Sequence, residues 1–163
     1  RGSDLQFKNK AFVNELVDWI RFSEKEVLAK GDGIWASSMG LPNTGRFIGS
    51  LLMKNFVSAK SERKRWDKLI SHSAGFALFM VHENNTGHWI NLGRAFQRFG
   101  LQATKLDIKH AHVNMPLEEM ETREKLTRHF ILSPKTPLLL IRFGKAEAMP
   151  YSFRRNINEI IIG

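Results

Sequence analysis

The 163-residue sequence has no cysteine, a single tyrosine and only five prolines, and none of its apolar runs approaches the length of a membrane span. Without cysteine the chain can form neither disulfides nor thiolate metal sites, and a cysteine nucleophile is excluded. A transmembrane helix needs about 18 or more consecutive apolar residues, so no membrane partner is expected. The sequence does not begin with a signal peptide, and a cytoplasmic location is therefore expected.

Length and composition predict one globular domain. The chain is 42% hydrophobic and 25% charged, which is typical of globular proteins and unlike disordered chains. A chain of this length suits a single domain. Residues 1–3 have the composition of a cleavage or expression remnant, so the domain is expected to span residues 4–163.

Basic residues exceed acidic ones by 25 to 16, which gives a formal net charge of +9. The excess is spread almost evenly, because residues 1–81 carry 13 basic and 8 acidic groups and residues 82–163 carry 12 and 8. The densest cluster, at residues 60–68, is interrupted by Glu62 and Asp67 and is typical of a solvated helix face. No nucleic-acid partner is therefore expected, although a basic nucleic-acid-binding domain stays open as an alternative.

Hydrophobic periodicity predicts helices separated by two continuous apolar runs. Helices are expected at residues 4–22, 46–58, 61–71, 87–106 and 117–131, with a short one after the capping box that begins at Ser23. The apolar runs 74–81 and 138–143 are typical of strands buried on both faces. Residues 108–115 are expected to form a short strand or an extended loop, and 153–162 an extended tail. Together these elements predict an α+β or α/β domain.

Two features of the predicted elements favour close contact with something else. The loop 34–41 is unusually apolar and must pack against the domain core, a partner chain or a flat ligand. Gly93 and Gly100 lie seven residues apart in the helix 87–106, and therefore on nearly the same face. A glycine pair on one face permits either tight helix–helix packing or the close approach of a ligand.

Hydrolytic and metal-dependent motifs are weak or absent. The sequence contains no Gly-x-Ser-x-Gly, no His-Glu-x-x-His and no phosphate-binding glycine-rich loop followed by Lys-Ser/Thr. His110 and His112 would share one face of a strand, but a zinc site needs a third ligand, and no metal is expected. Glu118 and Glu119 begin a helix, where carboxylates interact favourably with the helix dipole. No catalytic residue is assigned from these patterns.

The adjacent Arg154 and Arg155 follow a Pro-x-Ser step that begins at Pro150. Guanidinium groups offer planar, bidentate donors to phosphate, so the pair predicts an anion receptor. A solubilising role at the surface is the alternative interpretation.

Several short segments occur in an order that resembles a known family. They are Trp89, Gly93, Arg98-Phe99, Leu101–Thr104, Asn114–Glu118, Pro137–Gly144 and Pro150–Arg155, preceded by Trp19–Ser23, Gly31–Ile34 and Gly40–Pro42. This order resembles the nitroreductase-like FMN flavoproteins, and in particular a divergent bacterial branch often labelled nitroreductase or twin-arginine pathway signal protein. The resemblance covers about residues 10–162.

The resemblance implies an FMN-dependent oxidoreductase with a nitroreductase-like fold, in which helices flank a central mixed sheet. Such proteins pass electrons from NAD(P)H to nitroaromatic or quinone-like acceptors, and their flavin sites lie at a dimer interface. Carried over to this chain, the flavin ring would lie against the turn that contains Asn114, Pro116, Leu117 and Glu118. Arg154 and Arg155 would bind the FMN phosphate.

One departure from the family pattern qualifies this expectation. The family's N-terminal Arg-x-Ser-x-Arg-like motif, which contacts the phosphate and the ring, has no equivalent here. We therefore expect the chain to be the C-terminal part of a longer protein, paired with that missing part or with a second copy of itself. By itself such a chain would bind FMN weakly or not at all and be inactive. A non-catalytic flavin-binding or assembly module of the same fold is the alternative function.

Overall fold

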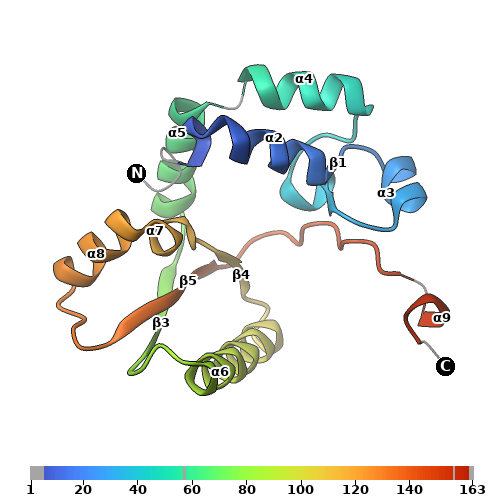
Figure 1. Ribbon diagram of the computed structural model, residues 1–163. Coiled ribbons are helices and arrows are strands. Elements are labelled where there is room, and N and C mark those ends of the chain that lie inside the picture. The colour runs from blue at the N-terminus through green and yellow to red at the C-terminus, as the bar shows by residue number, and fades with distance from the viewer. Residues whose placement is uncertain (1–5, 57, 156, 162–163) are drawn as a thin grey trace. The chain divides into compact units, whose positions relative to one another are not determined.

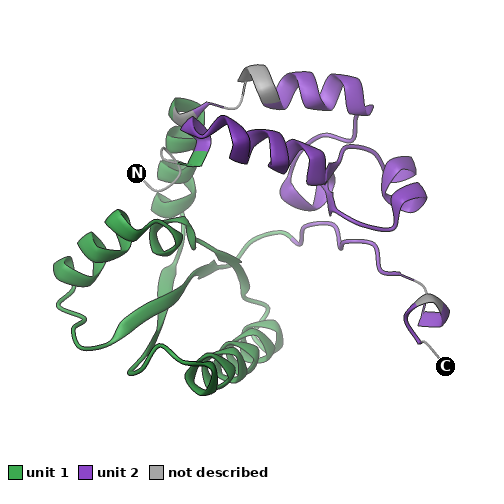
Figure 2. Ribbon diagram, in the orientation of Figure 1, with its two compact units in different colours: residues 1–6, 59–147 green, residues 7–58, 148–163 purple. Residues whose placement is uncertain are grey.

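The computed structural model describes residues 6–56, 58–155 and 157–161 (Figure 1). The chain divides into two compact units, which Figure 2 shows in different colours. Unit 1 contains residues 1–6 and 59–147, and unit 2 contains residues 7–58 and 148–163. Each unit is described by itself, and a single domain over residues 4–163 stays a prediction.

Unit 1 is built on a three-stranded antiparallel sheet. Strand β5 (Thr136–Gly144) lies between β3 (Gly75–Val81) and β4 (Lys109–His112) and is antiparallel to both. Helix α6 (Thr86–Lys105) connects β3 to β4 and contacts both strands. The segment that contains α6 is therefore a crossover connection between two strands that lie on either side of β5.

The contact between α6 and the sheet is aromatic. Phe79 of β3 meets Phe96 and Phe99 of α6 edge to face, with ring centroids 6.0 and 5.8 Å apart. Phe143 of β5 meets Phe99 at 6.1 Å. Each such pair contributes about 0.5–1.5 kcal/mol beyond the burial of apolar area, so this cluster fixes α6 on one face of the sheet.

The remaining helices of unit 1 are α5 (Ala59–Ser71), α7 (Met115–Glu118) and α8 (Met120–His129). Helices α7 and α8 both contact β5. The single helix expected at 117–131 is divided at Glu119, whose φ of −89° and ψ of 118° are extended rather than helical. The hydroxyl of Thr122 donates to the carbonyl of Glu119 at 3.0 Å, within the first turn of α8.

Residues 10–56 of unit 2 combine three α-helices with a two-stranded parallel sheet. The helices are α2 (Lys10–Trp19), α3 (Glu24–Lys30) and α4 (Arg46–Phe56), and a 3₁₀ turn, η1, spans Ala36–Met39. Strand β1 (Ile20–Arg21) pairs in parallel with β2 (Ile34–Trp35). Helix α2 ends at Trp19, three residues before the expected end, because Ile20 turns extended to pair with Ile34.

The core of unit 2 is built from residues between positions 17 and 53. Its buried residues are Val17, Ile20, Phe22, Ala36 and Met53, with Leu16, Met39 and Leu41 packed against them. The apolar loop 34–41 therefore packs largely into its own unit, which is one of the three possibilities that the sequence left open. Gly49 of α4 lies directly on Phe22, because a Cβ at that position would overlap the Phe22 ring.

The α+β class expected from the sequence is confirmed. The expected single mixed sheet is not observed, because the parallel pair and the antiparallel strands belong to separate sheets within the described residues. The tail is only partly extended, since Ile157–Ile160 form a short helix, α9. Several expected positions lie outside the described residues. They are the remnant at 1–3, residues 4–5 of the first helix, residue 57 of the helix 46–58, and residues 156 and 162 of the tail. Among the described residues, no helix is long and apolar enough to cross a membrane.

Candidate functional site

The six residues predicted to hold a cofactor fall into two groups. Asn114, Pro116, Leu117 and Glu118 belong to unit 1, and Arg154 and Arg155 belong to unit 2 (Figure 2). Each group is described within its own unit.

The side chain of Asn114 extends the β4–β5 ladder beyond the last strand residue. The backbone N–H of Val113 donates to the carbonyl of Leu140 at 2.8 Å. One residue later, Asn114 Oδ1 accepts from the N–H of Leu140 at 2.9 Å, and its Nδ2 donates to the carbonyl of Leu138 at 3.5 Å. The carboxamide thus replaces a peptide group at the point where Pro116 makes further pairing impossible.

The turn after Asn114 uses most of its own backbone donors. The N–H groups of Leu117 and Glu118 both donate to the carbonyl of Asn114, at 2.7 and 3.1 Å, and proline has no N–H. Leu117 is buried, whereas the exposed Glu118 accepts a hydrogen bond from Gln6 Nε2 at 2.9 Å. The hydroxyl of Thr122 donates a hydrogen bond to the Pro116 carbonyl at 2.8 Å. The turn is therefore rigid, and it offers a ligand the half-buried Pro116 ring and the Glu118 carboxylate.

Replacing Asn114 by alanine is expected to destabilise unit 1 by about 1–3 kcal/mol, because the peptide groups of Leu138 and Leu140 lose their partner. Asn114→Asp is the matched control. It keeps the acceptor for the Leu140 N–H but loses the weaker donor to Leu138, and its loss is expected to be smaller. Urea denaturation, monitored by amide hydrogen exchange in β5, measures both changes in stability. Equal stability of Asn114→Ala and the wild type would show that the carboxamide is dispensable.

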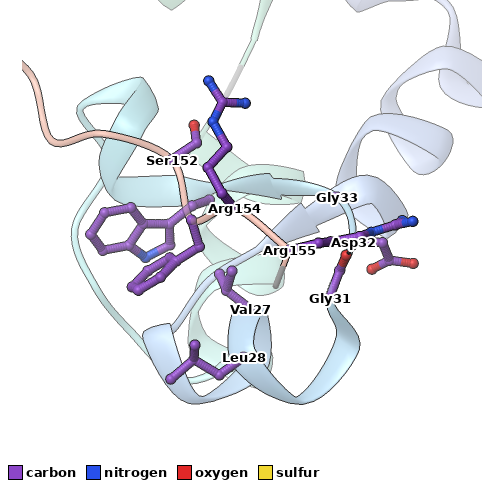
Figure 3. A pocket seen from close by; sticks show the side chains of 10 residues that line it. Val27, Leu28, Gly31, Asp32, Gly33, Ser152, Arg154 and Arg155 are labelled. Carbon is purple, nitrogen blue, oxygen red and sulfur yellow. Dashed lines mark hydrogen bonds between the residues drawn. The ribbon is translucent and has the colours of Figure 1, made fainter. Parts of the chain in front are cut away.

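Arg154 and Arg155 line a pocket of about 300 Å³ in unit 2 (Figure 3). Its lining combines the C-terminal end of α3 and the following loop with part of the tail. The lining residues are Val27, Leu28, Gly31, Asp32, Gly33, Trp35 and Ser152–Arg155. Residues from positions more than 110 apart in the sequence therefore form one site.

The first wall of the pocket follows from a glycine-flanked aspartate. Ser23 caps α3 by accepting from the N–H of Glu26 at 3.2 Å, and Gly31 ends the helix with a φ of +64°. Gly33 also has a positive φ, +77°. Glycine adopts such left-handed angles without steric cost, so the chain reverses within three residues and places Asp32 at the pocket.

Asp32 is held by a buried arginine. Arg21 donates from Nε and Nη2 to Asp32 Oδ1, at 2.9 and 2.8 Å, and from Nη1 to the carbonyl of Asp18 at 2.6 Å. The side chain of Arg21 is only 7% exposed and that of Asp32 is 38% exposed. The ion pair therefore lies beneath the pocket with its carboxylate facing outward, and it neutralises the charge of Asp32.

The second wall is formed by residues 152–155, which belong to the segment 148–155 that we call the strap. Arg155 Nε donates to the carbonyl of Gly31 at 2.9 Å, and Phe153 meets Trp35 edge to face with ring centroids 4.9 Å apart. The indole Nε1 of Trp35 is buried and has no hydrogen-bond partner among the described residues. An unpaired buried donor costs about 1–3 kcal/mol, so the buried position of the Trp35 indole carries an energetic cost.

The pocket has a positive net charge. Arg21 and Asp32 cancel, which leaves the two charges of Arg154 and Arg155. Figure 3 shows the side chain of Arg155 directed toward Gly31 and Asp32 and that of Arg154 directed away from them. Successive side chains of an extended chain point to opposite sides. Arg154 has no hydrogen-bond or ion-pair partner among the described residues, and Arg155 uses only Nε. Guanidinium N–H groups therefore remain for an anion.

Other candidates from the sequence carry less chemistry. His110 and His112 lie on the α6 face of the sheet, where both rings meet Phe96, and the described residues contain no group of three potential metal ligands. A Cβ added at Gly100 would lie 3.4 Å from His110 Nε2, whereas a Cβ added at Gly93 would meet nothing within 4 Å. The described contacts of this glycine pair thus involve a strand side chain and no second helix.

The basic cluster at residues 60–68 lies on α5, and its cationic side chains are exposed while Trp66 is half-buried. This arrangement fits the solvated helix face expected from the sequence. A nucleic-acid-binding role stays an untested alternative.

Sequence reasoning missed the part of the site that lies closest to the core. Arg21, Asp32, Gly33 and Trp35 shape the pocket, yet none of them was predicted to act there. The one available signal is the Gly-Asp-Gly sequence at 31–33, because two glycines around a carboxylate indicate a tight turn that presents it. Its partner Arg21 gave no signal of its own.

The chain shows no match to known protein families, curated proteins or solved structures.

Proposed function

We propose that the chain is part of an FMN-dependent oxidoreductase of the nitroreductase type, with a nitroreductase-like fold. The observation that carries this proposal is the pocket in unit 2, where Arg154 and Arg155 keep guanidinium N–H groups that have no partner in the described part of the chain. The order of sequence motifs that resembles the family supports it as well. The electron donor would be NAD(P)H and the acceptor a small nitroaromatic or quinone-like molecule.

The residues of the pocket fit the phosphate end of FMN. The site has a net formal charge of +2 and free planar donors, and these are what a phosphate dianion requires. Its volume of about 300 Å³ is at the low end of the range of about 300–1,000 Å³ for ligand pockets. The pocket therefore suits the phosphate and the adjoining chain better than a whole flavin.

In this proposal the chain binds and orients while FMN, when bound, supplies the redox chemistry. Arg155 holds the phosphate through charge-assisted hydrogen bonds, and the exposed side chain of Arg154, which Figure 3 shows directed away from Asp32, rotates toward the phosphate on binding. The role of the Asn114–Glu118 turn of unit 1 as a surface for a flavin ring rests on the family resemblance alone. The rigidity of that turn comes from the hydrogen bonds of Asn114 and Thr122.

The proposal also includes a homodimer, or pairing with a further N-terminal segment. Helix α4 supports this, because it exposes contiguous apolar side chains, among them Phe47 at 80% and Ile48 at 55%. Exposed apolar patches of this kind mark interaction surfaces.

The proposal is tested by titrating the chain with FMN and with riboflavin, which lacks the phosphate, and recording the quenching of flavin fluorescence. FMN is expected to bind at least about 10-fold more tightly, because its phosphate adds charge-assisted hydrogen bonds. Equal affinities for FMN and riboflavin would contradict the proposal. Binding of FMN without oxidation of NADH or NADPH would favour a non-catalytic flavin-binding or assembly module.

A further inference from the structure

Asp32 has one carboxylate oxygen without a partner at the pocket. Both donors of Arg21 that reach Asp32 bind Oδ1. Oδ2 makes no hydrogen bond among the described residues, and the side chain lines the pocket and is 38% exposed. The ion pair therefore presents an acceptor whose orientation is fixed by a buried guanidinium.

The acceptor lies in a pocket that also carries two arginines. Arg155 is bound to the carbonyl of Gly31, the residue before Asp32, and Figure 3 shows its side chain directed toward both. The pocket thus combines donors for an anion with a nearby acceptor for a hydrogen-bond donor. A bare anion would use only the first of these.

We infer that Asp32 is a specificity-determining residue, which accepts a hydrogen bond through Oδ2 from a hydroxyl group on the chain that carries the phosphate. The ligand class is a phosphate monoester of a polyol, to which the ribityl phosphate of a flavin nucleotide belongs. This inference rests on the proposed function, because it assumes that the arginines bind the phosphate. Ion pairing with Arg21 keeps Asp32 from repelling that phosphate.

The test compares two small probes, ribitol 5-phosphate and n-pentyl phosphate, which carry the same charge on chains of equal length with and without hydroxyl groups. Affinities come from the shifts of backbone amide resonances at 31–35 and 152–155. The wild type is expected to prefer ribitol 5-phosphate about 10-fold, as one hydrogen bond to a charged group implies.

The informative variant is Asp32→Asn. Its single oxygen remains with Arg21, so its NH₂ group, a donor, takes the place of Oδ2. The preference for ribitol 5-phosphate is expected to fall at least about threefold, since hydrogen bonds to ionised acceptors are roughly twice as strong as neutral ones. Glu15→Gln is the matched control, because Glu15 is exposed in the same unit, outside the pocket lining, and loses the same charge. It is expected to leave the preference unchanged.

The possible outcomes separate the inference from the proposed function. Absence of binding by both probes to the wild type would remove the phosphate site and with it the proposed function. Equal binding of both probes by the wild type would contradict only the role of Asp32. This outcome does not depend on whether any variant folds. An unchanged preference in Asp32→Asn would do the same.

Discussion

Replacing Arg155 by alanine is expected to weaken FMN binding by about 10- to 100-fold, and Arg154→Ala by a similar or smaller factor. Each loss corresponds to about 1.5–3 kcal/mol for a hydrogen bond to a charged group. The two variants differ in one respect. Arg155 also ties the strap to Gly31 through a 2.9 Å hydrogen bond, whereas Arg154 has no protein partner in the described chain.

The two arginines therefore make separable predictions. Arg155→Ala is expected to speed amide exchange in residues 149–155, because the strap loses one of its few contacts, while Arg154→Ala is expected to leave that exchange unchanged. Flavin fluorescence titration measures the affinities. Lys25→Ala serves as the control, because this exposed α3 residue lies outside the pocket lining and removes one positive charge. FMN affinity that is the same in all three variants would show that the arginines are surface charges.

Conservative replacement sharpens the test. Lysine keeps the charge but lacks the planar fork that meets a phosphate with two donors. Arg154→Lys is therefore expected to recover only part of the affinity lost in Arg154→Ala. Full recovery would indicate a general attraction between charges and not a directed contact.

The elements that could be predicted from sequence are those with one dominant signal. The helix observed at Thr86–Lys105 was predicted at 87–106, because apolar residues recur along it at three- and four-residue steps. The strand Gly75–Val81 was visible as an unbroken apolar run. These signals are local, since each depends only on residues within the element.

The boundaries that failed depend on contacts made at a distance. Nothing near Trp19 in the sequence ends a helix, and α2 stops there because Ile20 pairs with Ile34. The break at Glu119 likewise depends on Asn114, whose pairing with β5 fixes where the turn before α8 begins. Periodicity carries no information on such long-range pairs.

The candidate site shows the same division. Arg154 and Arg155 were identified because adjacent arginines are a recognisable pattern, and both line the pocket. Asp32 and its partner Arg21 come from another part of the chain, and their pairing is a property of the folded unit 2. A charged residue that acts through a buried partner cannot be distinguished in sequence from a solvated one.

Gly33→Ala is expected to destabilise unit 2 by about 2–5 kcal/mol. A residue with a side chain at a φ of +77° loses about 1–2 kcal/mol to left-handed strain, and forced contacts in a packed site add about 1–3 kcal/mol. Those contacts are specific, because the added Cβ would fall 2.5 Å from the Trp19 carbonyl oxygen and 2.9 Å from Arg21 Cζ. The carbonyl belongs to the backbone and cannot rotate away, so the β1–β2 pairing or the Arg21–Asp32 pair must shift.

Gly31→Ala separates the two causes. Gly31 has a similar φ of +64°, but its Cβ would meet nothing within 4 Å, so this variant is expected to lose only the backbone part, about 1–2 kcal/mol. Amide exchange at α2 and α3 under increasing urea measures the stability of unit 2 in both proteins. Because Arg21 holds Asp32 in place, Gly33→Ala is also expected to lower the preference for ribitol 5-phosphate at urea concentrations where the unit is still folded. Equal losses of stability in the two variants would mean that the backbone at Gly33 yields without disturbing Arg21, and the acceptor at Asp32 would then not depend on this close packing.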